Sequence, residues 1–116
     1  MEIRETQLLS PGVHPCVIEL REMLRRVLRD DFVRLYHYGS RVDGGAEPDS
    51  DYDVLCVTKR PLDPQERDEV LSRQLDIQME RNVLFDLHFY SEEQLRTPPL
   101  SFTPYVQRVT ARGIVV

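Results

Sequence analysis

The sequence predicts an α/β or α+β domain in which helices flank a small mixed β-sheet. Segments with helical periodicity alternate with segments rich in β-branched and aromatic residues, which is typical of a layered structure of helices and strands. The chain has 116 residues, of which 41% are hydrophobic and 30% are charged. It is therefore expected to form a single domain, residues 1–116, around a modest core.

The first strand is expected at residues 32–38, between a helix and a tight turn. Residues 1–14 show no clean period and contain Pro11 and Gly12, so they are expected to form a leader or a short entry turn. Apolar residues recur at helical spacing over residues 15–29, with Pro15 in the first turn, where proline is tolerated. Residues 32–38 are aromatic and β-branched, and Gly39 follows at once, which indicates a strand that runs into a turn.

A loop and a second strand follow. Residues 39–50 contain three glycines and one proline, so they are expected to form a loop with room for one helical turn. The second strand is expected over residues 51–58, with the apolar run 54–57 as its buried end and Pro61 as its stop.

A long helix is expected from residue 64 to residue 81. Asp63, Pro64 and Glu66 match a capped start, with an acidic N-cap, proline at the first helical position and glutamate three residues after the cap. The helical spacing places three large apolar side chains on one face, namely Leu71, Leu75 and Met79.

The clearest strand pattern covers residues 83–90, where apolar residues at odd positions alternate with mostly polar residues at even positions. One face of this strand is therefore expected to be core and the other polar. After it come a short helix from residue 91, a break at Pro98-Pro99, a helix from residue 103 to about residue 113, and an apolar tail at 114–116.

Charge is concentrated in one short segment. Fifteen Lys and Arg residues against twenty Asp and Glu residues give a net charge of −5, so nucleic-acid binding is not expected. Five acids and no base lie between residues 43 and 53, and acids packed so closely persist where solvent or a cation compensates them. Cys16 and Cys56 are far apart and are expected to be buried free thiols.

The chain is expected to be cytoplasmic and without a membrane anchor. Its first residues lack the charged-then-apolar pattern of a signal peptide. No apolar run approaches the ~18 residues that a membrane-spanning helix needs.

Three aspartates are candidate metal ligands and catalytic groups. Asp51 and Asp53 are two residues apart at the start of a predicted strand, so their side chains point to the same face. Asp86 lies on the polar face of another predicted strand and joins them if the two strands are neighbours. Oxygen ligands of this kind suit a hard divalent cation that also binds phosphate oxygens, which predicts Mg²⁺. The alternative is a solvated acidic turn and an ordinary strand acid, and His88 beside Asp86 is either functional or structural.

A turn that could hold phosphate oxygens precedes the first two of these aspartates. Gly39 and Ser40 follow the first predicted strand directly, so a backbone without a Cβ and a hydroxyl lie in the turn. Ten residues separate this pair from Asp51 and Asp53, and that order between two strands is more specific than the pair alone. Arg41 is either a nucleotide contact or a surface charge.

These motifs resemble the minimal nucleotidyltransferases of the DNA polymerase beta superfamily. The resemblance rests on Tyr38-Gly39-Ser40-Arg41, on Ser50-Asp51-Tyr52-Asp53-Val54, on Asp86-Leu87-His88-Phe89-Tyr90, which is similar to the segment with the family's third carboxylate, and on the ending Arg-Gly-Ile-Val-Val. It implies a mixed sheet flanked by helices. It also implies an enzyme that transfers a nucleoside monophosphate from a nucleoside triphosphate to an acceptor hydroxyl.

The resemblance implies a role for each motif residue. The expected nucleotide contacts are Gly39, Ser40 and Arg41, and the expected catalytic and metal-binding residues are Asp51, Asp53 and Asp86. In this scheme Asp86 occupies a second metal position or activates the attacking hydroxyl. The expected donor is ATP and the expected cofactor is Mg²⁺.

The resemblance also implies a protein partner. Many such proteins are antitoxins paired with a HEPN-type toxin, and some adenylylate that partner on tyrosine. The expected acceptor is therefore a hydroxyl on a HEPN-type partner, and a second chain or a second copy of this one is expected to supply the acceptor or complete the site.

Two rival functions remain. Asp43 and Glu47 stand in a loop where family members often carry basic residues, which favours a weak or inactive protein that neutralises its partner by binding alone. Transfer to a small molecule, as in antibiotic-modifying relatives, is the third possibility, and the expected lack of a second domain argues against it.

Overall fold

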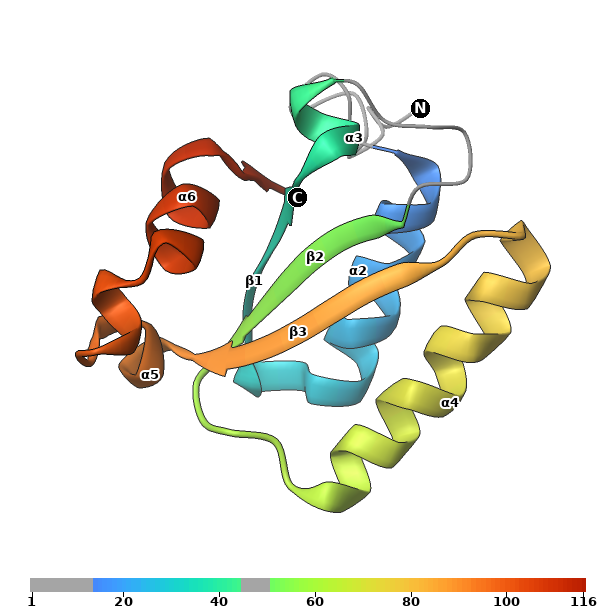
Figure 1. Ribbon diagram of the computed structural model, residues 1–116. Helices are drawn as coiled ribbons and strands as arrows, with labels where there is room; N and C mark the ends of the chain where they lie inside the picture. The colour runs from blue at the N-terminus through green and yellow to red at the C-terminus, as the bar shows by residue number, and fades with distance from the viewer. Residues whose placement is uncertain (1–13, 45–50) are drawn as a thin grey trace, which may run out of the picture.

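The computed structural model describes residues 14–44 and 51–116 (Figure 1). In chain order its elements are α2 (Pro15–Leu28), the 3-10 helix η1 (Arg29–Asp31), β1 (Phe32–Tyr38), α3 (Ser40–Asp43), β2 (Tyr52–Thr58), α4 (Pro64–Arg81), β3 (Phe85–Ser91), α5 (Glu92–Arg96), the 3-10 helix η2 (Leu100–Phe102), α6 (Pro104–Arg112) and β4 (Ile114–Val115). The expected leader, apart from His14, and most of the acidic loop lie outside the described residues.

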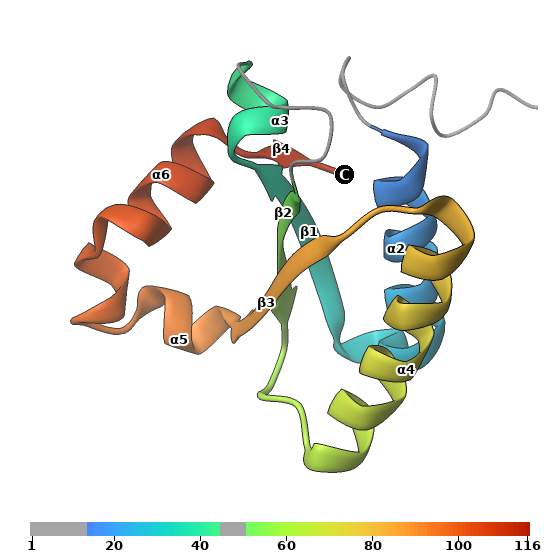
Figure 2. The same ribbon diagram turned by 45° about the vertical axis from the view of Figure 1, so that its right-hand side comes forward.

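A four-stranded mixed sheet forms the centre of the molecule, in the order β3-β2-β1-β4. β1 is antiparallel to β2 and to β4, and β2 is parallel to β3. Helices α2 and α4 cover one face of the sheet, and α5 and α6 lie over the other (Figure 2). The predicted mixed sheet flanked by helices is therefore confirmed.

β2 is a central strand whose side chains enter both layers. Val54 and Cys56 belong to the core under α2 and α4, whereas Leu55 and Val57 pack on the α6 side. A strand buried on both faces needs apolar residues at consecutive positions, which explains the run at residues 54–57. Both cysteines of the chain are buried and free, as expected.

The ends of α4 show how local signals set the boundaries. The Asp63 carboxylate accepts a hydrogen bond of 2.8 Å from the Glu66 N–H, and the Glu66 carboxylate accepts one of 3.1 Å from the Asp63 N–H, which confirms the predicted capping box. The Val83 N–H still donates to the Gln78 carbonyl at the end of the helix. The sequence predicted that this strand begins at residue 83, but β3 begins at Phe85.

The apolar stripe of α4 faces solvent. Leu71, Leu75 and Met79 are 53%, 46% and 83% exposed, so the large residues that share a helical face are not the ones that pack. The helix instead buries Val70 and Ile77 in the core beside α2. Periodicity identified a helix, but the β-branched side chains of Val70 and Ile77, on its other side, are the ones that meet the core.

His37 on β1 is a buried polar side chain in the α2 layer. It is fully inaccessible to solvent, and neither ring nitrogen has a hydrogen-bond partner among the described residues. Burial, together with the nearby charges of His14 and Arg41, lowers the pKa of His37 to about 4. The ring is therefore neutral at physiological pH.

None of the helices in the described part of the chain is long and apolar enough to cross a membrane.

We expect Leu75→Gln to change the free energy of unfolding by less than about 0.5 kcal/mol, because the side chain is exposed. Ile77→Ala removes buried methyl groups and should lower it by about 2–4 kcal/mol. Urea denaturation measures both values. A loss above about 1 kcal/mol for Leu75→Gln would show that this face is packed in the native protein.

We expect acid to destabilise the protein through His37. The unfolded side chain takes up a proton near its ordinary pKa of 6.5, whereas the folded one resists protonation down to a pKa of about 4. Stability should therefore fall as the pH drops from 6.5 towards 4, by an amount on the order of 3 kcal/mol from this residue. Denaturation of the wild type and of His37→Leu across this range tests it, and the variant should lose less stability. Parallel pH curves would contradict the assignment.

Candidate active site

Three strand ends meet at one edge of the sheet. In the hydrogen-bonded register, Asp53 of β2 lies opposite Tyr38 of β1 on one side and opposite Asp86 of β3 on the other. Residues opposite each other share a face of the sheet. Asp53 and Asp86 therefore lie side by side on the face that carries α6.

The acidic side chains act on one another electrostatically. Burial raises the pKa of Asp53 above its ordinary value, and the charges of Asp86 and then Asp51 raise it further. Asp51 and Asp86 are exposed, so solvent reaches the cluster. Carboxylates at this spacing repel one another, and a bound cation would relieve that repulsion.

The donor set fits a hard cation only in part. Among the residues that the structure describes, no three histidine, cysteine or acidic side chains are arranged to hold a metal ion by themselves. Asp53 and Asp86 do offer carboxylate oxygens from neighbouring strands. Mg²⁺ is commonly held by one or two carboxylates, with water and substrate phosphate oxygens as the other ligands. The pair therefore suits Mg²⁺ that arrives with a phosphate substrate, and does not suit a metal enclosed by protein.

Gly39 has no tolerated replacement at its position. Its φ angle is +86°, in the region that favours glycine, and an added Cβ would collide with the Asp53 carboxylate. The turn thus brings the backbone directly against Asp53 of the acidic pair. The Gly39 carbonyl accepts from the Val42 N–H at 2.9 Å, which closes the single helical turn α3. The side chain of Ser40 is not among those that the structure describes, so the expected contact of its hydroxyl with phosphate stays a prediction.

Arg41 lies apart from the acidic cluster. Its guanidinium carbon is 4.2 Å from the centre of the Tyr52 ring, a cation–π distance. Tyr52 is buried in the core on the α2 side, where its ring contacts those of His14 and His37. The described structure therefore brings Asp51, Asp53, Asp86 and Gly39 together but holds Arg41 against the opposite face of the sheet.

The structure places two further side chains beside the carboxylates, and the first of them is His88. His88 Nε2 lies 3.1 Å from Asp86 Oδ1, and the His88 ring also contacts the Tyr105 ring from α6. The alternation in β3 already placed His88 on the face of Asp86. The structure adds the partner, because the 3.1 Å distance joins His88 Nε2 to one particular oxygen of Asp86.

Tyr105 is the other group, and no sequence signal pointed to it. Its hydroxyl lies 3.0 Å from the hydroxyl of Tyr38. Burial raises the pKa of Tyr105, and the charges of Asp86 and Asp53 add to that rise, so its hydroxyl lies in the field of the acidic pair. Two residues that are 67 positions apart in the chain thus meet beside the cluster.

A comparison with known proteins identifies the family. The sequence model described as "Nucleotidyltransferase domain" matches residues 19–110, most of the chain. The spectinomycin 9-adenylyltransferase of Enterococcus faecalis is 31% identical over 55 residues, which are 47% of this chain and 22% of that protein. The chain therefore spans less than a quarter of the length of this curated relative.

A solved structure shares the fold. The spectinomycin adenyltransferase AAD(9) from Enterococcus, crystallised with ATP and spectinomycin, superimposes with a TM-score of 0.61 at 24% identity. The match covers 69% of this chain and 34% of that one. The match over residues 19–110 includes the glycine turn and all three aspartates, so the chain belongs to the nucleotidyltransferase domain family.

Proposed function

We propose that this chain transfers AMP from ATP to an acceptor hydroxyl with the help of Mg²⁺. The observation that carries the proposal is the Asp53–Asp86 pair on adjacent strands, directly against the Gly39 turn, in a chain of this family. A turn without a Cβ lets triphosphate oxygens approach the backbone. The two carboxylates would hold the cation, which would supply positive charge for the phosphate oxygens.

Each residue then has a defined task in the transfer. The acceptor oxygen attacks the α-phosphorus as the bond to the bridging oxygen breaks, and pyrophosphate leaves. Asp53, with Asp51 beside it, holds the metal position, and Asp86 accepts the proton of the acceptor hydroxyl. When bound, Mg²⁺ would neutralise the phosphate charge. The raised pKa of Asp53 supports this scheme, because the folded protein stores a repulsion that cation binding would release.

His88 is proposed as a positioning residue for Asp86. A hydrogen bond from Nε2 to Oδ1 would hold one carboxylate oxygen and leave the other free towards Asp53. The Tyr105 ring, which packs against His88, restrains the imidazole from the α6 side. This arrangement keeps Asp86 oriented before substrate arrives.

The acceptor is proposed to be a protein hydroxyl on a HEPN-type partner, with this chain as the antitoxin of the pair. Asp51, Asp86 and His88 are all exposed, so a group on a large molecule can reach the site. Two observations favour rivals. The solved relative was crystallised with ATP and spectinomycin, which favours a small-molecule acceptor. Arg41 lies on the other face of the sheet from Asp53, which favours weak triphosphate binding and neutralisation of a partner by contact alone.

We expect Asp53→Asn and Asp86→Asn each to lower AMP transfer by about 10²–10⁴-fold, because each removes a group from the metal site or the proton transfer. The measurement follows label from α-labelled ATP to a co-expressed HEPN-type protein and, separately, to spectinomycin. Chelation of Mg²⁺ should abolish the same signal. Asp68→Asn, an exposed acid on α4, is the matched control and should keep activity within about twofold.

The acceptor that takes the label decides among the candidates. Label on the protein supports the antitoxin enzyme, and label on spectinomycin supports the small-molecule enzyme. No transfer to either, with partner neutralisation retained by an Asp51→Asn, Asp53→Asn double variant, would establish binding alone and refute the proposed activity.

We expect His88→Leu to lower kcat about tenfold or more, because Asp86 loses a charge-assisted hydrogen bond. His88→Gln keeps an N–H at a similar reach and should recover most of the rate. The KM for ATP should change little in either variant. Tyr90→Phe, two residues along the same strand face, is the control. Equal losses in the Gln and Leu variants would show that the ring itself, and not its hydrogen bond, is needed.

A further inference from the structure

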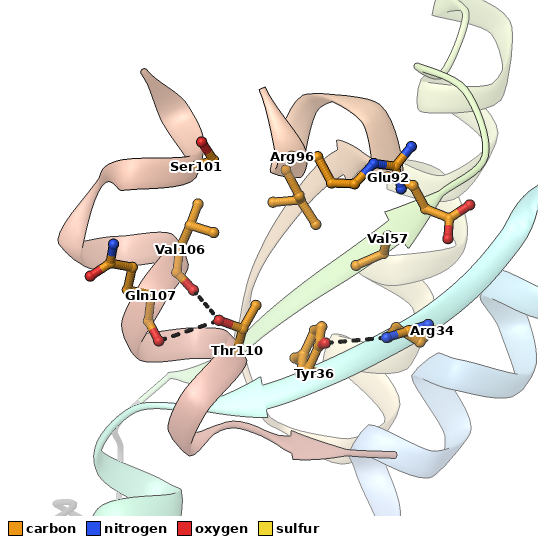
Figure 3. A pocket seen from close by; sticks show the side chains of 10 residues that line it. Arg34, Tyr36, Val57, Glu92, Arg96, Ser101, Val106, Gln107 and Thr110 are labelled. Carbon is orange, nitrogen blue, oxygen red and sulfur yellow. Dashed lines mark hydrogen bonds between the residues drawn. The ribbon is translucent and has the colours of Figure 1, made fainter. Parts of the chain in front are cut away.

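A cavity lies on the same face of the sheet as the acidic cluster, at the other end of the strands. Its volume is about 310 Å³, and it is a partly open cavity between β1 and β2 on one side and the segment from α5 to α6 on the other (Figure 3). Tyr38 lies opposite Asp53 at the cluster end, whereas Arg34 lies opposite Val57 at the cavity end. Four strand residues, roughly 13 Å, separate the two places.

The cavity has both apolar and polar walls. Val57 from β2 and Val106 from α6 line it from two sides, beside the ring of Tyr36 (Figure 3). Leu95 adds a further apolar side chain, and Ser101, Gln107 and Thr110 add polar ones. Small-molecule sites combine apolar walls with polar groups that orient the ligand, and this volume lies at the lower end of the range of roughly 300–1,000 Å³ for such sites.

Two guanidinium groups, those of Arg34 and Arg96, lie at the rim, and neither forms an ion pair among the described residues, although Glu92 lines the same cavity. Arg34 donates to the Tyr36 hydroxyl at 3.4 Å, and Arg96 makes no ion pair within the part of the chain that the structure describes. Other arginines of this acidic chain do pair, as Arg60 does with Asp31 and Glu66. Two cations at one cavity repel each other unless an anion lies between them.

We propose that this cavity binds a small organic anion. Its apolar body would lie against Val57 and Val106, and its carboxylate or phosphate group would accept hydrogen bonds from Arg34 and Arg96, whose planar groups match such anions. Glu92 lines the same rim and disfavours a second negative group, so the ligand has a single anionic end. The proposal does not depend on the nucleotidyltransferase activity.

Helix α6 connects the cavity with the acidic cluster. Val106 and Thr110 of this helix face the cavity, while Tyr105 hydrogen-bonds Tyr38 and packs on His88. An occupant that contacts α6 therefore contacts the helix that carries a group of the cluster. This gives the ligand a physical route to act as an effector.

Phenyl phosphate and benzoate are suitable probes, because each joins one ring to one anionic group. We expect saturable binding of at least one probe by titration calorimetry, with amide NMR shifts at Val57, Val106 and Thr110. An Arg34→Gln, Arg96→Gln double variant should weaken binding at least tenfold. Arg108→Gln, Arg112→Gln removes the same charge from exposed positions of α6 and should change it by less than twofold. Thr110→Phe, which fills the cavity and keeps both rim charges, should also abolish binding.

Three results would overturn the proposal. The first is no saturable binding of either probe up to about 10 mM, because a dissociation constant above that value is too weak for a specific site. The second is an equal loss in the two double variants, which would show attraction to net charge alone. The third is amide NMR shifts confined to Gly39, Asp53 and Asp86, which would place the probe at the candidate active site and not in the cavity.

Discussion

The site depends on the position of Asp53 between two neighbouring strands. Tyr38 lies beside it in antiparallel β1 and Asp86 lies beside it in parallel β3, so one register sets both neighbours. A shift of one residue would turn every side chain of β2 to the other face, so Asp53 would leave the face of Asp86, and Val54 and Cys56 would leave the core under α2 and α4. The hydrophobic core therefore holds two carboxylates together in spite of the repulsion that the raised pKa of Asp53 records. Gly39 is required by the same arrangement, because any Cβ there would meet that carboxylate.

The two faces of the sheet have different roles. The face under α2 and α4 holds the larger apolar cluster and the neutral, solvent-excluded His37, so it contributes most of the burial that stabilises the domain. The opposite face is covered by the short helices α5 and α6 (Figure 2), which leave polar side chains accessible. The acidic cluster and the cavity at Arg34 both lie there. The contact of Arg41 with Tyr52 ties the turn that follows β1 to the stabilising face, while Gly39 of the same turn lies against Asp53 on the other face.

Elements that rest on local interactions were predictable. The capping box at Asp63 and Glu66, the apolar run of β2 and the alternation of β3 depend on neighbours within a few residues, and the structure contains all three. The expected shared face of Asp51 and Asp53 rested on a strand that begins at residue 51, but β2 begins at Tyr52, so Asp51 precedes the pleated strand. The packing face of α4 was not predictable in this way. Leu71, Leu75 and Met79 share a helical face, but whether it is buried depends on where α2 and the sheet lie, which helical spacing does not encode.

The sequence by itself determined the alternation of helices and strands, the family motifs and the types of the reacting groups. Each of these is a property of residues close together in the chain, where backbone geometry fixes which side chains share a face. Only the tertiary structure decided that β3 pairs with β2 and so places Asp86 beside Asp53, that Arg41 lies on the other face, and that Tyr105 from α6 meets Tyr38 and His88. These are contacts between segments separated by tens of residues. They are selected by the burial of the whole core, and no local pattern carries that information.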